Sequence, residues 1–408
     1  MYTMLQKKNE LLREDAAEFT RELIRTPSPS LNEADVAELV EKQFETLNYD
    51  RVFRDDAGNV IGILDGRQDG PTLLLNAHMD TVRANPDEWS TPPHEPRLVD
   101  GRLRGLGASD CKGGISACLF AGQLLRRCML PLRGNLVVAA TVAEENGRSL
   151  GVRTLMEETL PELHLQPDYA VLGEPTNLRL FYGHDGWVEL EVELDSENPF
   201  HVRDAIQTLS QELPSCLNDT ESGTEMEFAG LNGVSFEEGS GRQSARIRLN
   251  RRLRSSENAG EVARRLKKEV AAAANAPDSL ALNVRVSEHN QQLYTGRTLT
   301  VRNVTEAWET DPFHKLVERA RQTLKAAGIE ARPGKWELRR LRMGTAGSVL
   351  VREYNVPTIG FGPGNEVEAH SPDECVELEK LHRSIYGLAS IAHGLIGVPV
   401  FGWTSNEI

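Results

Sequence analysis

One stretch of this sequence limits the possible folds more than any other. Residues 136–143 (LVVAATVA) are apolar at nearly every position and show no alternation. Such a run is typical of a strand whose two faces are both covered by helices, as in a mostly parallel sheet. Helix-like spacing at 11–24, 33–47 and 113–127 and strand-like segments at 60–64 and 72–77 surround it. We therefore expect an α/β domain with a mostly parallel sheet flanked by helices.

The middle of the chain has a different pattern. In residues 187–194 the aliphatic side chains at 188, 190, 192 and 194 alternate with glutamates at 189, 191 and 193. Alternation of this kind predicts a strand with one buried and one exposed face. The order from 187 to 286 is strand, helix, strand, strand, helix, strand, which is a ferredoxin-like α+β unit. We therefore predict a discontinuous α/β domain, residues 1–183 and 294–408, interrupted by an inserted α+β domain, residues 184–293.

Charge and composition exclude several classes of function. The 408 residues include 46 Lys and Arg against 61 Asp and Glu, a formal charge of −15, and no basic stripe that would indicate a nucleic-acid partner. The longest apolar stretches have about the length of a strand, far short of the roughly 20 residues that span a membrane. The N-terminus has no apolar signal segment, and five unpaired-looking cysteines predict neither a disulfide framework nor a zinc finger. Cytoplasm is the expected compartment.

Two pairs of polar residues follow strand-like runs. His78 and Asp80 come directly after residues 72–77, and positions i and i+2 of an extended chain share a face, so Asp80 can orient the imidazole of His78. Glu144 and Glu145 end the run 136–143. Adjacent residues of a strand point to opposite faces, so one of these carboxylates can bind a metal while the other acts as a base.

Three more candidates lie in loops of the same kind. Asp110 lies in a glycine-rich turn, residues 105–114, that opens a helix and lacks the spacing of a phosphate-binding loop. Glu174 follows a third run, and His370 lies in a loop after residues 357–361. Two histidines with several carboxylates suit zinc or a related divalent ion. Five ligands are too many for one catalytic zinc and suit two ions about 3.5–4 Å apart that share a carboxylate.

The motifs HMDT, GLGASDCKGG, VAEEN, GEPTN and GFGPGNEVEAHSPDE resemble those of the M20 metallopeptidase and deacylase family, which includes acetylornithine deacetylase and succinyl-diaminopimelate desuccinylase. The resemblance covers nearly the whole chain, in the family's order. Residues 335–374 are most similar to a bacterial branch of hydrolases linked to selenium metabolism. The resemblance implies a catalytic domain with an inserted lid or dimerisation domain.

The resemblance also implies a role for each candidate. Two divalent ions are the expected cofactors, zinc first, with cobalt or manganese as alternatives. One ion would be held by His78 and Glu174, the other by Glu145 and His370, and both by Asp110, with Asp80 orienting His78 and Glu144 as general base. Glu144 would take a proton from a shared water, and the hydroxide would attack an amide carbonyl. The peptide bond between Asp110 and Cys111 would be cis, with Cys111 a small buried neighbour of the metals rather than a reactive thiol.

The inserted domain departs from the family's pattern. A histidine in a Gly-x-x-x-His-Ser motif, which helps to stabilise the oxyanion, is missing before Pro199, and the family's Asn-Val-x-Pro segment is not evident near 239–244. His184 and His201 lie nearby, but we interpret both as surface residues. Arg252 matches the family's lid arginine and is the expected binder of a substrate carboxylate. Losing one oxyanion donor typically costs about 10²–10³ in kcat.

These observations predict a di-metal hydrolase that cleaves an amide bond of a small N-acyl amino acid. Two alternatives stay open: a dipeptidase or carboxypeptidase on the same scaffold, and a non-catalytic metal-binding or ligand-binding relative with an altered lid. The expected partners are a small-molecule amide or dipeptide and a second copy of the chain, joined through the inserted domain.

Overall fold

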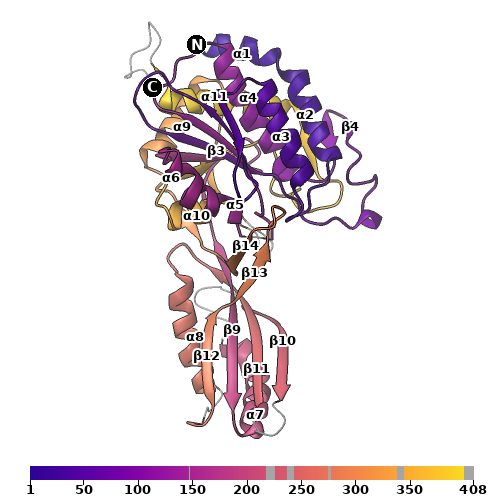
Figure 1. Ribbon diagram of the computed structural model, residues 1–408, viewed down its shortest axis with the longest axis vertical. Coiled ribbons are helices and arrows are strands. Elements are labelled where there is room, and N and C mark those ends of the chain that lie inside the picture. The colour runs from indigo at the N-terminus through magenta and orange to yellow at the C-terminus, as the bar shows by residue number, and fades with distance from the viewer. Residues whose placement is uncertain (147, 217–225, 237–242, 274–276, 338–343, 399–408) are drawn as a thin grey trace.

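The computed structural model describes residues 1–146, 148–216, 226–236, 243–273, 277–337 and 344–398. Two large sheets dominate the chain, one in a wide upper part and one in a narrow arm below it (Figure 1). The upper part combines a large sheet with helices on both faces, and the arm is an α+β unit. This confirms the fold class expected from the sequence, while the domain boundaries at residues 184 and 293 stay a prediction.

The upper sheet has nine strands in the order β1-β2-β6-β3-β7-β18-β8-β16, with β17 beside β8. The central neighbours β6, β3, β7 and β18 run parallel, whereas the pairs toward the edges are antiparallel except β17–β8. The parallel arrangement predicted from the sequence therefore holds at the centre of a mixed sheet. Its strands are β1 (Arg51–Arg54), β2 (Val60–Leu64), β3 (Leu73–His78), β6 (Leu136–Thr141), β7 (Tyr169–Leu172), β8 (Leu180–His184), β16 (Trp308–Glu309), β17 (Pro333–Trp336) and β18 (Thr358–Gly360).

Both faces of this sheet are covered, as the apolar run of β6 predicts. Every residue of β3 and β6 is buried, and successive side chains enter different cores: Leu75 packs in one and Leu74 in the other. Helices on the first face are α1 (Tyr2–Glu10), α2 (Arg13–Arg25), α3 (Ala34–Thr46), α4 (Gly113–Arg127), α9 (Lys315–Ala326) and α11 (Leu378–Ile396); those on the second are α5 (Leu150–Thr154), α6 (Leu160–Glu162) and α10 (Gly347–Arg352). Among the described residues, none of the helices combines the length and apolar character that a membrane span requires.

The sheet of the arm has the order β10-β11-β9-β12, with β15 beside β9. The alternation in β9 separates its two faces: Leu190 and Val192 pack under the arm's helices, and Glu191 faces Arg246 and Arg285 on neighbouring strands. The elements are β9 (Gly186–Ser196), α7 (Pro199–Cys216), β10 (Met226–Phe236), β11 (Gln243–Leu253), α8 (Ala259–Ala273), β12 (Ala281–Val286) and β15 (Val304–Thr305). The strand–helix–strand–strand–helix–strand order is the predicted one.

A hairpin that the sequence did not predict joins the arm to the upper part. It consists of β13 (Glu288–Gln292) and β14 (Thr298–Arg302) and lies at the junction of the two parts (Figure 1). At its turn, the Tyr294 hydroxyl donates to the Gly58 carbonyl at 3.0 Å, and Arg297 donates two hydrogen bonds to Glu158, one of 2.7 Å. The arm is thus held to the upper part by side chains as well as by the continuous chain.

Candidate metal centre

His78 is the last residue of β3, and its ring is held from one side by Asp80. The ring Nδ1 lies 2.9 Å from the backbone carbonyl oxygen of Asp80 and 3.5 Å from its Oδ1. The predicted pairing is therefore present, with the backbone oxygen as the nearer partner. Nε2 points the other way, 3.2 Å from Asp110 Oδ1 and 3.9 Å from Glu174 Oε2. All four side chains are buried.

Asp110 lies between two histidines. Its Oδ1 faces His78, and its Oδ2 lies 3.4 Å from Nε2 of His370. The turn Ala108–Lys112 that carries it has non-helical backbone angles at Asp110 and Cys111, and the peptide bond between these two residues is cis, as the resemblance implied. A carboxylate that presents one oxygen to each histidine is suited to bridge two cations.

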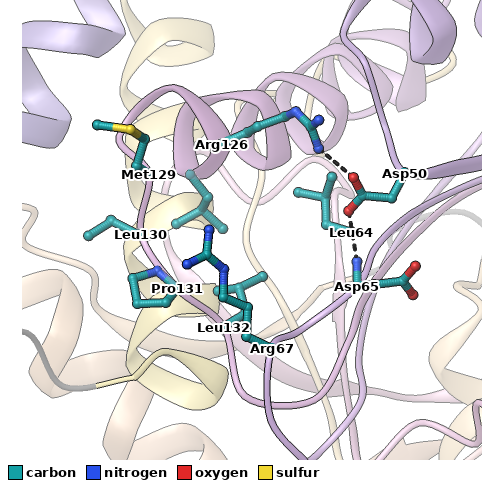
Figure 2. Close-up of a pocket in the computed structure, with 10 residues that line it drawn as sticks. Asp50, Leu64, Asp65, Arg67, Arg126, Met129, Leu130, Pro131 and Leu132 are labelled. Atoms are coloured by element: carbon teal, nitrogen blue, oxygen red, sulfur yellow. Dashed lines mark hydrogen bonds and ion pairs between the residues drawn. The ribbon is translucent and has the colours of Figure 1, made fainter.

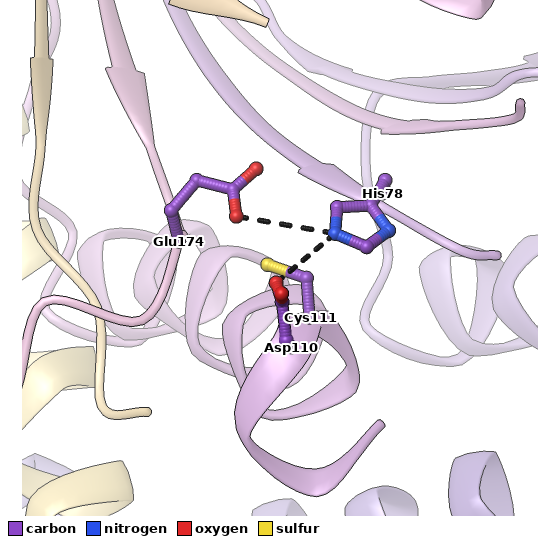
Figure 3. A group of neighbouring side chains, drawn as sticks. All are labelled: His78, Asp110, Cys111 and Glu174. Atoms are coloured by element: carbon purple, nitrogen blue, oxygen red, sulfur yellow. Dashed lines mark hydrogen bonds and ion pairs between the residues drawn. The ribbon is translucent and has the colours of Figure 1, made fainter. Parts of the chain in front are cut away.

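Two overlapping groups of possible metal donors result. One contains His78, Asp110, Cys111 and Glu174, shown in Figure 3, and the other contains Asp110, Glu145 and His370; within each, the donor atoms lie within 4.8 Å of one another. In the second group His370 Nε2 is 2.5 Å from Glu145 Oε1. Mixed nitrogen and oxygen donors in two groups that share one carboxylate fit a pair of divalent ions.

The loop with Glu144 and Glu145 is held by a buried carboxylate. The Oδ1 and Oδ2 atoms of Asp80 each accept a backbone N–H at 3.0 Å, from Glu144 and Glu145 respectively, and Oδ2 also accepts the Ser30 hydroxyl at 2.5 Å. Behind it, Glu33 accepts the N–H of Ala143 at 3.1 Å. Asp80 therefore positions both His78 and the acidic pair, a double role that the sequence did not reveal.

A second buried carboxylate, Glu374, holds the turn with Asp110. Its Oε1 accepts the N–H groups of Ser109 and Asp110, both at 2.8 Å, and its Oε2 accepts that of Gly107 at 3.0 Å. Glu374 ends the motif that contains His370. One short loop therefore supplies the candidate donor His370 and also fixes the turn that carries the candidate donor Asp110. Sequence reasoning missed Glu374 and Glu33 because nothing in the pattern shows which backbone groups a carboxylate will meet.

Crowded acids and histidines shift one another's proton affinity. Burial opposes protonation of His370, but the charges of Glu145 and Asp110 outweigh it and raise its pKa to about 9. Burial also opposes protonation of His78, yet Glu174 and Asp110 raise its pKa well above the usual value. Protonated imidazoles thus neutralise the carboxylates in the metal-free protein, and a bound cation would replace those protons.

Glu144 and Glu145 are partly buried, whereas Asp110 and Glu174 are buried. Burial raises the pKa of Glu144 to about 7, with a smaller opposing effect from His78. A carboxylate with a pKa near neutrality can both accept and return a proton. Cys111 lies at the opposite extreme: burial, followed by the Glu174 carboxylate, raises the pKa of its thiol well above the usual value.

Three further residues named from the sequence, His184, His201 and Arg252, belong to neither donor group. His184 is buried rather than on the surface, which corrects our interpretation: its Nε2 is bound by Thr345, and its ring packs edge-on against Trp308. His201 lies beyond the far end of β9 and contacts Ser279. Ten residues of strand separate that end from the junction, about 33 Å. His201 is therefore unsuited to replace the missing histidine within one chain.

Arg252 lies on β11 directly opposite Trp187, the second residue of β9. Arg148, from the loop after Glu145, connects this position to the metal cluster. Its guanidinium lies 4.3 Å from the centre of the Trp187 ring, and its Nη1 donates to the Glu145 carbonyl at 3.0 Å. A cation over an aromatic face is an attractive contact. The loop with the acidic pair is thereby joined to the base of the arm.

A separate pocket of about 390 Å³, whose lining residues are shown in Figure 2, lies near the start of β6. One of its lining residues is Leu64, which pairs with Leu136 at the start of β6. The metal cluster, in contrast, lies beyond the carboxyl ends of β3 and β6. An ion pair between Arg126 and Asp50, 2.6 Å long, closes one side. Ligand sites of α/β sheets lie at the carboxyl ends of the strands, so this pocket is not the candidate site.

In this site, one carboxylate is shared by two donor groups, each with a histidine, near the carboxyl ends of the parallel strands. Metal-dependent hydrolases use sites of this kind. The sequence model that describes peptidase family M20/M25/M40 matches residues 74–393 of this chain, so the chain belongs to that family. It is therefore a metal-dependent amidohydrolase or peptidase.

Several relatives share most of the chain's length. The uncharacterized protein YgeY of Escherichia coli K12 is 26% identical over 400 residues, 91% of this chain and 92% of that protein. A putative LysW-lysine/LysW-ornithine hydrolase of Pyrococcus abyssi is 25% identical over 394 residues, covering 95% and 96%.

Solved structures show the same fold. The dipeptidase Dug1p of Saccharomyces cerevisiae aligns with a TM-score of 0.69 and 13% identity over 97% of this chain and 98% of its own. The Bacillus subtilis YXEP protein, described as a dinuclear metal-binding peptidase of the M20 family, aligns with a TM-score of 0.66 and 14% identity over 94% and 98%.

Proposed function

We propose that this chain hydrolyses the amide bond of a small N-acyl amino acid at a pair of divalent ions, with Glu144 as general base. The observation that carries the proposal is the position of Asp110, whose two oxygens face His78 and His370 separately, with Glu174 and Glu145 beside them. When bound, two ions would polarise the amide carbonyl and lower the pKa of a water molecule.

The protein's own residues would then move the proton. Glu144 accepts it from the attacking water and delivers it to the nitrogen of the leaving amine. Asp80 keeps Glu144 and Glu145 in place through their backbone N–H groups, so that the base and the neighbouring donor keep a fixed separation. Glu374 does the same for Asp110. We assign the carboxylate of the product amino acid to Arg252, because a guanidinium can bind it with two hydrogen bonds.

The names of two relatives support hydrolysis of an acyl or amino-acid conjugate. One relative is an N-formyl-4-amino-5-aminomethyl-2-methylpyrimidine deformylase of Bacillus subtilis, 30% identical over 208 residues, and another is the LysW-lysine/LysW-ornithine hydrolase described above. A dipeptidase or carboxypeptidase activity is the alternative on the same residues. The two differ in the acyl group on the carbonyl side of the scissile bond, which is a simple acyl group in the first case and an aminoacyl or peptidyl group in the second.

A substrate panel tests the proposal. N-formyl, N-acetyl and N-succinyl amino acids are compared with dipeptides, using the full chain loaded with zinc. We expect turnover of the acylated amino acids, and a loss of about 10²–10⁴-fold in kcat in Glu144→Gln with metal content unchanged. Glu45→Gln, an exposed glutamate, is the matched control. Turnover of dipeptides alone would replace the proposal by its alternative, and full activity of Glu144→Gln would overturn the mechanism.

We further propose zinc as the resident metal, because the donors are imidazole and carboxylate groups. Cobalt and manganese are the alternatives, and metal analysis of protein purified without chelator distinguishes them.

A homodimer through the edge strand β10 of the arm is proposed on the strand order alone and is tested by light scattering. The four described cysteines, Cys111, Cys118, Cys128 and Cys375, form no disulfide, which agrees with our proposal of a cytoplasmic location.

A further inference from the structure

The sulfur of Cys111 lies among the donors of the first metal group. Its Sγ is within 4.8 Å of the donor atoms of His78, Asp110 and Glu174. Figure 3 shows it beside the Asp110 carboxylate, between the Glu174 carboxylate and the His78 ring. Two donor atoms bound to one tetrahedral zinc ion at about 2.0–2.3 Å are about 3.3–3.8 Å apart, so metal binding would draw the donors of this group together.

Packing keeps the sulfur beside these donors. Cys111 is fully buried, and its thiol donates a weak hydrogen bond to the Gly173 carbonyl at 3.4 Å. At Gly114, in the first turn of α4, a Cβ atom would lie 2.8 Å from the sulfur and would also meet the backbone of Gly173. The glycine therefore leaves the space that the sulfur occupies, and the backbone directs the thiol toward the donors rather than toward solvent.

We propose that Cys111 is a further donor to the ion held by His78 and Glu174, and that it makes this position prefer zinc or cobalt to manganese or magnesium. The inference rests on the metal centre of the proposed function. On binding, a sulfur–metal bond forms, the S–H bond breaks, and the proton leaves to solvent. Soft thiolate ligands favour zinc over the hard cations, for which carboxylates alone suffice.

The test uses the full chain with cobalt(II) in both positions. A thiolate bound to cobalt(II) gives a charge-transfer absorption band in the near ultraviolet, which nitrogen and oxygen donors do not give. We expect the band in the parent and its loss in Cys111→Ser. The matched control is Cys118→Ser: Cys118 is buried on α4, which follows the turn with Cys111, and it lies near Gly173 but belongs to neither donor group. This variant should keep the band.

The outcomes separate this inference from the proposed function. Two bound cobalt ions without the band in the parent would overturn the role of Cys111 and leave the metal centre intact. No bound cobalt would overturn both. A second measurement is competition between zinc and manganese, in which we expect Cys111→Ser to reduce the preference for zinc at least about tenfold. If Cys111→Ser does not fold, the parent spectrum and that of Cys118→Ser still decide the question.

Discussion

At the scale of single residues, the proposed role of Glu144 as general base predicts how activity depends on pH. A general base must be ionised, and burial raises the pKa of Glu144 to about 7. We therefore expect kcat/KM to fall about tenfold for each pH unit below that pKa. Bound cations favour the ionised form of Glu144 and therefore move the acidic limb of the kcat/KM profile to lower pH. The pH profile of the zinc-loaded protein checks this, and an unchanged limb in the residual activity of Glu144→Gln would assign it to another group.

The proposed role of His370 as a metal donor predicts that metal binding depends on pH as well. Its pKa is raised to about 9 without a metal, so the imidazole should be protonated at neutral pH and lose its proton on metal binding. Apparent metal affinity should therefore rise as the pH increases from neutrality to about 9. Calorimetry in two buffers of different ionisation enthalpy counts the released protons. Equal heats in the two buffers would contradict the prediction.

Glu374 should affect the metals without touching them. In Glu374→Gln the amide nitrogen faces a backbone N–H that the carboxylate accepted, so one hydrogen bond is lost. We expect a loss of about 1–3 kcal/mol in the free energy of unfolding, and about 10–100-fold weaker metal binding. Urea unfolding and metal titration measure the two effects. Glu377→Gln, three residues away in a partly exposed position, should change neither.

The sequence could predict that the candidate donors lie close together, but not what holds them in place. His78, Glu144 and Glu145 follow strands, and strand ends meet at one edge of a sheet, so their proximity could be inferred. Glu33 and Glu374 act on backbone groups 110 and 264 residues away. No local pattern specifies such a contact, because a backbone N–H is present at almost every residue.

At the scale of elements, the contact of Arg148 with Trp187 joins the loop after β6 to the start of β9. We expect Arg148→Met and Trp187→Leu to be coupled by about 0.5–2 kcal/mol in a double-mutant cycle of unfolding. Arg179, which lies 4.8 Å above the Phe181 ring, provides the control. Arg179→Met combined with Trp187→Leu should be additive. Additivity of the Arg148 pair would show that the stacking has no energetic weight.

Elements were predictable where side chains alternate or stay apolar. The run 136–143 predicted β6, and the glutamates of 187–194 predicted the exposed face of β9. The hairpin strand β13 has no buried residue. Strand β4 (Arg97–Val99) is fully exposed. It pairs with β5 (Arg102–Arg104), which in turn pairs with β19 (Cys375–Glu377). Short strands that bury little carry no hydrophobic pattern, and their pairing follows from the turn instead.

At the scale of the whole molecule, hairpin β13–β14 connects the two sheets. We expect Tyr294→Phe, which removes the hydrogen bond to Gly58, to cost about 0.5–1.5 kcal/mol of stability. Amide hydrogen exchange should become faster in residues 288–302 and stay unchanged in β3 and β6. Thr298→Val, at an exposed position of β14, is the control. Equal protection of the hairpin in Tyr294→Phe would show that its turn does not depend on this contact.

The hairpin also determines where the chain can be divided in protein engineering. A truncation that deletes residues 184–293 would cut next to Tyr294, within the hairpin turn, and would leave β14 without β13 and β15 without β9. Exposed, unpaired strands promote aggregation. A deletion from 186 to 305 removes both pairs together. A shortened catalytic domain with these ends should remain monodisperse, whereas the shorter deletion should precipitate.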